Sequence, residues 1–152
     1  SFSVEFKTTL RWNINASKKD PAIEHASLKT VNAFLNSSGG SLIIGIRDDG
    51  SLAGLELDQF ASEDKMSLHF WNLVKTSMGQ DVSPFVRTTF ESAGDKRVLL
   101  VQCARSPRPV FLQQKNVPEE EFYIRVGPSS SRLSVREALL YVAQHFPEAN
   151  QI

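Results

Sequence analysis

The sequence predicts a compact α+β domain with a mixed or antiparallel sheet and about three helices. Strand-like segments outnumber helix-like segments, and many strands are followed directly by a partner, which favours α+β over an alternating α/β arrangement. Hydrophobic residues make up 41% of the 152 residues, including ten Phe, so a chain of this length can fill one core. We therefore expect a single domain over residues 1–152, and the absence of an initial Met predicts that it belongs to a longer protein.

The first segment, residues 2–7, alternates apolar with polar side chains, which is the pattern of a half-buried strand. We expect Glu5 and Lys7 on the face of this strand that does not enter the core. Residues 11–19 are polar and punctuated by Asn and Ser, so we expect them to form a loop.

The next segment carries a strong signal for the start of a helix, Asp20 followed by Pro21. Asp caps the first backbone N–H groups, and Pro suits the first helical position. The helix is expected to end near Leu35, with a buried stripe at three- and four-residue spacing. The opposite stripe is polar, and taken alone it favours a solvated helix face. Its members are His25, Lys29, Asn32 and Asn36.

Turn residues and apolar runs place the remaining elements. A strand over 41–47 follows the first helix, and the turn Asp48-Asp49-Gly50 leads to a short partner over 51–55. A second helix over 62–78 is expected to end at Gly79. Further along, we expect a hairpin from 86–91 and 97–103, a short strand at 110–112, a strand at 122–126, a Gly/Ser turn and a last helix over 134–145.

The net charge and the single cysteine do not by themselves indicate which class of ligand the protein binds. Seventeen Lys and Arg balance seventeen Asp and Glu, which neither favours nor excludes a nucleic-acid partner because net charge hides its distribution. The single cysteine, Cys103, lies in an apolar run and is expected to be a buried, unreactive thiol. We see no signal peptide and no run long enough to span a membrane, so we expect a cytoplasmic protein.

Glu5, Lys7 and Asp48 are the candidate catalytic residues. Carboxylates on neighbouring strand ends, here Glu5 and Asp48, can hold Mg²⁺ or Mn²⁺, and Glu24 is a further candidate ligand. Lys7 beside them can neutralise a phosphate or a developing negative charge. From spacing alone, however, an exposed Glu–Lys pair and an ordinary turn aspartate remain the favoured interpretation.

The candidate phosphate-binding residues lie mainly in the segment from Arg125 to Arg132, where Ser129 and Ser130 stand between two guanidiniums. Hydroxyls, backbone N–H groups and arginines are the usual partners of phosphate oxygens, and Lys29 on the polar helix stripe is a further candidate. The alternative is a serine-rich turn that only leads into the last helix. A nucleotide P-loop is not indicated, because its Gly-rich signature is absent.

Four separate motifs, in order, resemble the AlbA-like domain of the Schlafen family over about residues 2–142. The stretch Leu10-Arg11-Trp12-Asn13 is more similar to the prokaryotic, single-lobe members. The four motifs are Val4-Glu5-Phe6-Lys7, residues 29–36 leading through Gly39-Gly40 to 42–46, Asp48-Asp49-Gly50 with Gly54-Leu55, and residues 122–127 before the serines.

The resemblance implies a nucleic-acid-binding fold. Some animal members of the family are metal-dependent endoribonucleases that act on structured RNA such as transfer RNA. The resemblance therefore also implies a candidate nuclease site, which in those members uses two glutamates and one aspartate. Glu5 matches the second glutamate and Asp48 the aspartate, whereas the first glutamate would precede Ser1. Whether this chain is an enzyme therefore stays open at this point.

Three functions remain as alternatives. The first is a DNA- or RNA-binding domain with a nuclease site at Glu5, Lys7 and Asp48, and the second is a non-catalytic binding module of a larger regulatory or defence protein. The third is a dimerisation domain. The animal relatives join two such lobes around a basic groove, so we expect this single lobe to form a homodimer that shares one groove.

Overall fold

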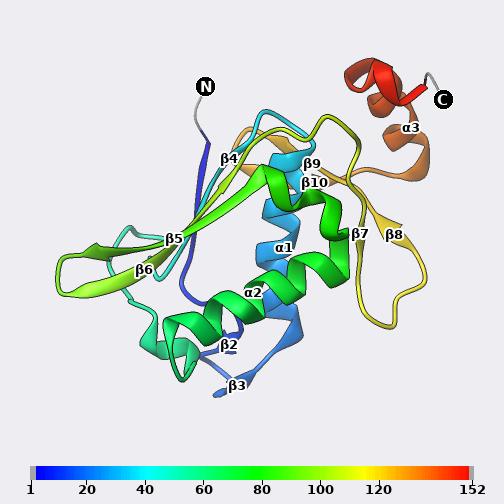
Figure 1. The fold of residues 1–152 in the computed structure, drawn as a ribbon. Helices are drawn as coiled ribbons and strands as arrows, with labels where there is room; N and C mark the ends of the chain where they lie inside the picture. The colour runs from blue at the N-terminus through cyan, green and yellow to red at the C-terminus, as the bar shows by residue number, and fades with distance from the viewer. Residues whose placement is uncertain (1–2, 151–152) are drawn as a thin grey trace.

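The computed structural model describes residues 3–150 and confirms the α+β class that the sequence predicts (Figure 1). Its main sheet has four strands in the order β1-β4-β6-β5, and three two-stranded sheets complete the strands of the described residues. The strands are β1 (Val4–Lys7), β2 (Trp12–Asn13), β3 (Lys18–Lys19), β4 (Gly40–Ile44), β5 (Val86–Ala93), β6 (Lys96–Cys103), β7 (Leu112–Gln113), β8 (Glu120–Glu121), β9 (Tyr123–Val126) and β10 (Ser129–Arg132). The helices are α1 (Pro21–Leu35), α2 (Glu63–Met78) and α3 (Val135–His145), with short 3-10 turns at Glu56–Asp58, Gln80–Phe85 and Pro147–Asn150.

The main sheet is covered on one face. In Figure 1, α1 stands in the middle of the molecule, with the sheet on its left and β7 and β8 on its right, while α2 crosses in front. The core between them includes Phe34 of α1, Phe70 of α2 and Leu42 of β4, all fully buried. Asp20 caps α1 by accepting a hydrogen bond from the backbone N–H of Ala22, as the sequence predicts.

β1 lies beside β4, as expected, but its polar side chains do not lie on the expected face. β1 lies parallel to β4, but Glu5 pairs with Leu42 and Lys7 with Ile44, so both polar side chains point to the face that the helices cover. Val4 lies on the open face and is 40% exposed. Alternation in the sequence distinguishes two faces without showing which one is covered. Because β1 is an edge strand, its charged groups reach the margin of the core and find partners there.

The turn before β4 needs glycine. Gly39 has φ +77°, and a Cβ at this position would lie 2.5 Å from the backbone oxygen of Cys103 on β6. Cys103 itself is buried, and burial raises the pKa of its thiol to about 12, in agreement with the expected unreactive cysteine.

Several expected segments differ in their details, and the partner strand expected over 51–55 is only a single bridge between Ile46 and Leu52. Residues 11–19 contain a small antiparallel ladder, β2 with β3, because the backbone N–H groups at its start are held by the buried carboxylate of Asp58. The strand expected over 41–47 ends at Ile44, where Gly45 takes φ +106°. The expected Gly/Ser turn is in fact a hairpin, because the serines continue as strand β10 against β9.

The polar stripe of α1 is only partly solvated. Asn32 and Asn36 are 0% exposed, so the expected solvated face is wrong at these two positions. Asn36 accepts a hydrogen bond from the N–H of Val110 at 2.8 Å and donates to the carbonyls of Val110 and Tyr123 at 2.9 and 3.0 Å. Asn32 accepts from the N–H of Tyr123 at 2.9 Å. The two side-chain amides thus form hydrogen bonds with the backbone of two segments that cross α1, as a neighbouring strand would.

The last helix, α3, docks through a second, smaller apolar cluster. Phe122, Ala138 and Phe146 form its buried part, and Leu133 and Tyr141 pack against it. Ser134 caps α3 through a reciprocal capping box with Glu137, so the expected start of this helix is confirmed. Figure 1 shows α3 standing out from the body of the molecule at the upper right, next to the C-terminus.

Candidate nucleic-acid interface

Glu5, the first candidate catalytic residue, is bound to Arg125. Nη2 of Arg125 donates to Oε1 of Glu5 at 2.8 Å, and Nζ of Lys7 lies 3.7 Å from Oε2. The Arg125 side chain is only 7% exposed and the Glu5 side chain 24%. Nη1 of Arg125 also donates to Ser130 at 3.0 Å, and the guanidinium carbon lies 5.1 Å from the ring centroid of Phe34. Arg125 therefore holds Glu5 from within the fold.

The predicted metal ligands do not form one group. Glu24 of α1 pairs with His69 of α2, and Asp48 lies in an exposed turn beyond the end of β4. Within residues 3–150 no three His, Cys, Asp or Glu side chains are arranged so that they could hold a metal ion. With Glu5 bound to Arg125 and Lys7, the side chains present do not fit a divalent cation.

A second charged cluster lies between α1 and the β9–β10 hairpin. Its centre is Glu121, which is 2% exposed and accepts hydrogen bonds from the hydroxyl of Tyr123 at 2.9 Å and from Gln114 at 2.6 Å. Nε2 of His25 lies 3.2 Å from Oε1 of Glu121, and Nη1 of Arg132 lies 3.6 Å from Oε2. The buried carboxylate therefore anchors two basic groups that come from distant parts of the chain.

Lys29 lies in the same region, because it follows His25 by one turn of α1. Burial lowers the pKa of His25 from its ordinary value, Glu121 partly opposes that effect, and the charges of Lys29 and Arg132 lower the pKa further. The charges of Lys29 and Arg132 thus act on one imidazole, although the two residues belong to different elements, α1 and β10. Burial and the bond to Glu121 raise the pKa of Tyr123 well above its usual range.

We call His25, Lys29 and Arg132 the basic cluster. Of the five predicted phosphate-binding residues, the structure brings Lys29 and Arg132 into this cluster and gives Arg132 a 51% exposed side chain. Ser129 is exposed at the hairpin tip, whereas Ser130 and Arg125 bond to each other. Sequence reasoning missed Glu121, because one glutamate in a run of three carries no signal that it is the buried one.

Protonation of His25 is expected to destabilise the fold. Its pKa is lowered in the folded state from an ordinary value of about 6.5, so the unfolded chain binds the proton more strongly. The free energy of unfolding should therefore fall as the pH drops below about 7, and His25→Gln should flatten this dependence. Urea unfolding between pH 5 and 8 measures it, with His145→Gln at an exposed histidine as the control. Equal slopes in both variants would show that His25 does not cause the effect.

The fold and the two clusters define a small α+β domain in which a hairpin crosses the central helix and gathers basic side chains beside it. A family model described as Schlafen, AlbA_2 matches residues 1–134, nearly the whole chain. The chain therefore belongs to the Schlafen AlbA_2 family, as the resemblance in its sequence predicts.

One of the similar solved structures shows the same fold. The DIP2311 protein from Corynebacterium diphtheriae is 23% identical with a TM-score of 0.65, and the match covers 94% of this chain. It covers only 27% of that chain, so this chain spans about a quarter of that relative. The N-terminal domain of a RecG-related protein from Nitrosomonas europaea matches with 19% identity and a TM-score of 0.48, over 88% of this chain and 83% of that one.

None of the curated proteins matches the chain. Among the described residues, no helix is both long enough and apolar enough to cross a membrane.

Proposed function

We propose that this domain binds nucleic acid through the basic cluster on α1 and the β9–β10 hairpin, and that it binds without cutting. The observation that carries the proposal is that His25 and Arg132 both contact the carboxylate of Glu121, with Lys29 one helical turn after His25 on α1. Membership of the Schlafen AlbA_2 family supports the same class of ligand. An ammonium and a guanidinium in one region of the surface can contact phosphates of one strand, with Arg132 able to bind two oxygens at once.

The basic cluster carries only a small net positive charge, and this predicts a small number of phosphate contacts. Glu121 lies beneath Arg132 and offsets part of its charge, and the lowered pKa of His25 favours the neutral imidazole. Two phosphate contacts are therefore the expected contribution of this face. Contacts of this kind read the backbone and not the bases, so we expect affinity with little sequence preference and a strong dependence on salt.

The part of the proposal that concerns cutting depends on Arg125. In a metal-dependent nuclease the carboxylates must be free to bind the cation, whereas both oxygens of Glu5 face a cationic side chain from this chain itself. Glu24 is similarly engaged by His69. The family's endoribonuclease activity stays a prediction for this chain, and the side-chain arrangement favours the binding module.

The test is a binding titration with the double variant Lys29→Ala/Arg132→Ala. Fluorescence anisotropy with labelled transfer RNA and labelled single-stranded DNA gives the dissociation constant at several salt concentrations. For the single strand, the slope of log affinity against log salt should become shallower by about 1.4, because each lost phosphate contact removes about 0.7.

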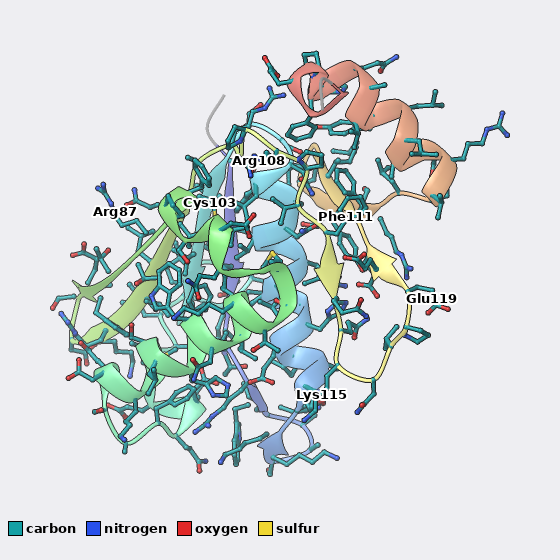
Figure 2. The ribbon with its side chains drawn as sticks, turned by 45° about the vertical axis from the view of Figure 1, so that its right-hand side comes forward. Arg87, Cys103, Arg108, Phe111, Lys115 and Glu119 are labelled. Atoms are coloured by element: carbon teal, nitrogen blue, oxygen red, sulfur yellow. The ribbon has the colours of Figure 1, made fainter. Side chains whose placement is uncertain are left out.

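The matched control removes one lysine and one arginine elsewhere. Lys75 on α2 and Arg87 on β5 are exposed, and Figure 2 shows Arg87 on the left, away from the β9–β10 hairpin. Lys75→Ala/Arg87→Ala should leave the slope unchanged, and an equal loss in both double variants would remove the basic cluster from the interface. Incubation of the RNA with Mg²⁺ or Mn²⁺ should leave it intact, and cleavage that disappears in Glu5→Gln would replace the binding module by a nuclease.

A further inference from the structure

A groove runs between α3 and the segments around β8, and it shares Arg132 with the basic cluster. It encloses about 660 Å³ and is lined along one side by Val135 and Leu139 of α3 and along the other by Phe111. Phe122 and Leu133 contribute to its lining as well. Figure 2 shows Phe111 and Glu119 below α3, on the same side of the molecule. The groove therefore lies where the projecting helix α3 meets the body of the domain, and apolar side chains from both sides line it.

The walls of this groove expose three large apolar side chains. Val135 is 79% exposed, Leu139 69% and Phe111 40%, which makes them three of the eight large apolar side chains exposed in residues 3–150. Single exposed apolar residues are normal on a protein surface, but a group of them in one groove is typical of an interaction site. The family match ends at residue 134, immediately before α3 begins. The groove thus depends on an element beyond the matched region.

The charges at its rim indicate what kind of segment fits. Glu119, Glu120 and Glu137 are exposed around the groove. The one basic side chain in its lining, Arg132, lies 3.6 Å from the buried carboxylate of Glu121, which offsets its charge. The rim therefore has an excess of negative charge, and complementary charge on a partner speeds encounter and selects against acidic segments.

We propose that this groove binds an amphipathic, basic peptide segment of a partner protein. Two or three large apolar side chains on one face of the segment would lie between α3 and Phe111, with Lys or Arg side chains beside Glu119, Glu120 and Glu137. The highly exposed walls favour an elongated segment over a small molecule, because a small-molecule site encloses most of its ligand.

The test uses three fluorescein-labelled probe peptides of equal length, with anisotropy as the readout. The first has leucines at helical spacing and lysines on its other face, the second replaces each lysine by glutamate, and the third scrambles the first. Only the first should bind tightly to the wild-type domain. The charge-reversal variant Glu119→Lys/Glu120→Lys should weaken the first peptide and strengthen the second.

The chain itself offers a matched pair of variants. Leu139 lines the groove, whereas Leu140 is similarly exposed, at 60%, and does not line it. Leu139→Asp should weaken binding of the first peptide about tenfold or more, as expected for the loss of one buried leucine contact. Leu140→Asp should change it less than about twofold. Both sites are exposed, so both variants should fold, which circular dichroism confirms before the titration.

Three outcomes overturn the proposal. Equal losses in Leu139→Asp and Leu140→Asp would mean that the peptide binds elsewhere, and equal binding of the basic and acidic peptides would mean that the rim charge has no role. The third outcome is that light scattering shows the wild-type domain to be a dimer and Leu139→Asp to be a monomer. In that case the occupant is a second copy of this chain, and the predicted homodimer forms through α3.

Discussion

Asn36→Ala is expected to lower the free energy of unfolding by about 3–5 kcal/mol. The side chain is fully buried and makes hydrogen bonds with the backbone of Val110 and Tyr123. Alanine would leave the N–H of Val110 and the carbonyl of Tyr123 buried without this partner, at about 1–3 kcal/mol for each group, and would add a small cavity. Urea unfolding followed by circular dichroism measures the loss.

Asn72→Ala is the control, since Asn72 is exposed on α2 and the same atoms are removed. It should change the stability by less than about 0.5 kcal/mol. If Asn36→Ala lowered the free energy of unfolding as little as Asn72→Ala, the hydrogen bonds of the Asn36 amide would not be needed to hold the segments around Val110 and Tyr123 against α1. The apolar contacts of α1 would then carry the docking of the hairpin.

The helices show how far local sequence signals reach. The sequence predicts the cap of α1 at Asp20, and the predicted ranges of α2 and α3 begin at Ser62 and Ser134, which the structure shows to be their caps. Caps are local, because one side chain bonds to a backbone N–H two or three residues further on. The β5–β6 hairpin is local in the same sense and was predicted for the same reason.

Long-range contacts account for what the sequence did not show. Asn32 and Asn36 look like solvated polar residues, and only the crossing of Val110 and Tyr123, more than 70 residues later, makes them buried. Residues 129–132 look like a turn because three serines disfavour a strand, yet pairing with β9 keeps them extended.

The candidate site follows the same rule. Its residues are predicted from local patterns: Glu5 from an alternating strand, Lys29 from a polar helix stripe and Arg132 from a serine-rich segment. Their roles are not, because an arginine 120 residues away decides whether Glu5 is free. Charge type and spacing therefore predict which side chains are candidates, while the tertiary contacts decide between a metal ligand and an internal ion pair.

Arg125→Ala is expected to lower the free energy of unfolding by about 2–4 kcal/mol, somewhat less than a fully buried ion pair because Glu5 keeps partial contact with solvent. The variant loses the bond to Glu5, the bond to Ser130 and the contact with the ring of Phe34. Arg125→Lys keeps the charge but cannot make the two directed bonds, so it should restore only part of the stability.

A double-mutant cycle separates the ion pair from the rest of the loss. Glu5→Gln, Arg125→Ala and the combined variant are unfolded in urea, and we expect a coupling energy of about 1–3 kcal/mol. A coupling near zero would leave Glu5 energetically free and would reopen the metal site. The nucleic-acid titration then gives the second readout, in which Arg125→Ala should keep the wild-type salt slope because its guanidinium is 7% exposed. A slope shallower by about 0.7 for a single strand would instead place Arg125 among the phosphate contacts.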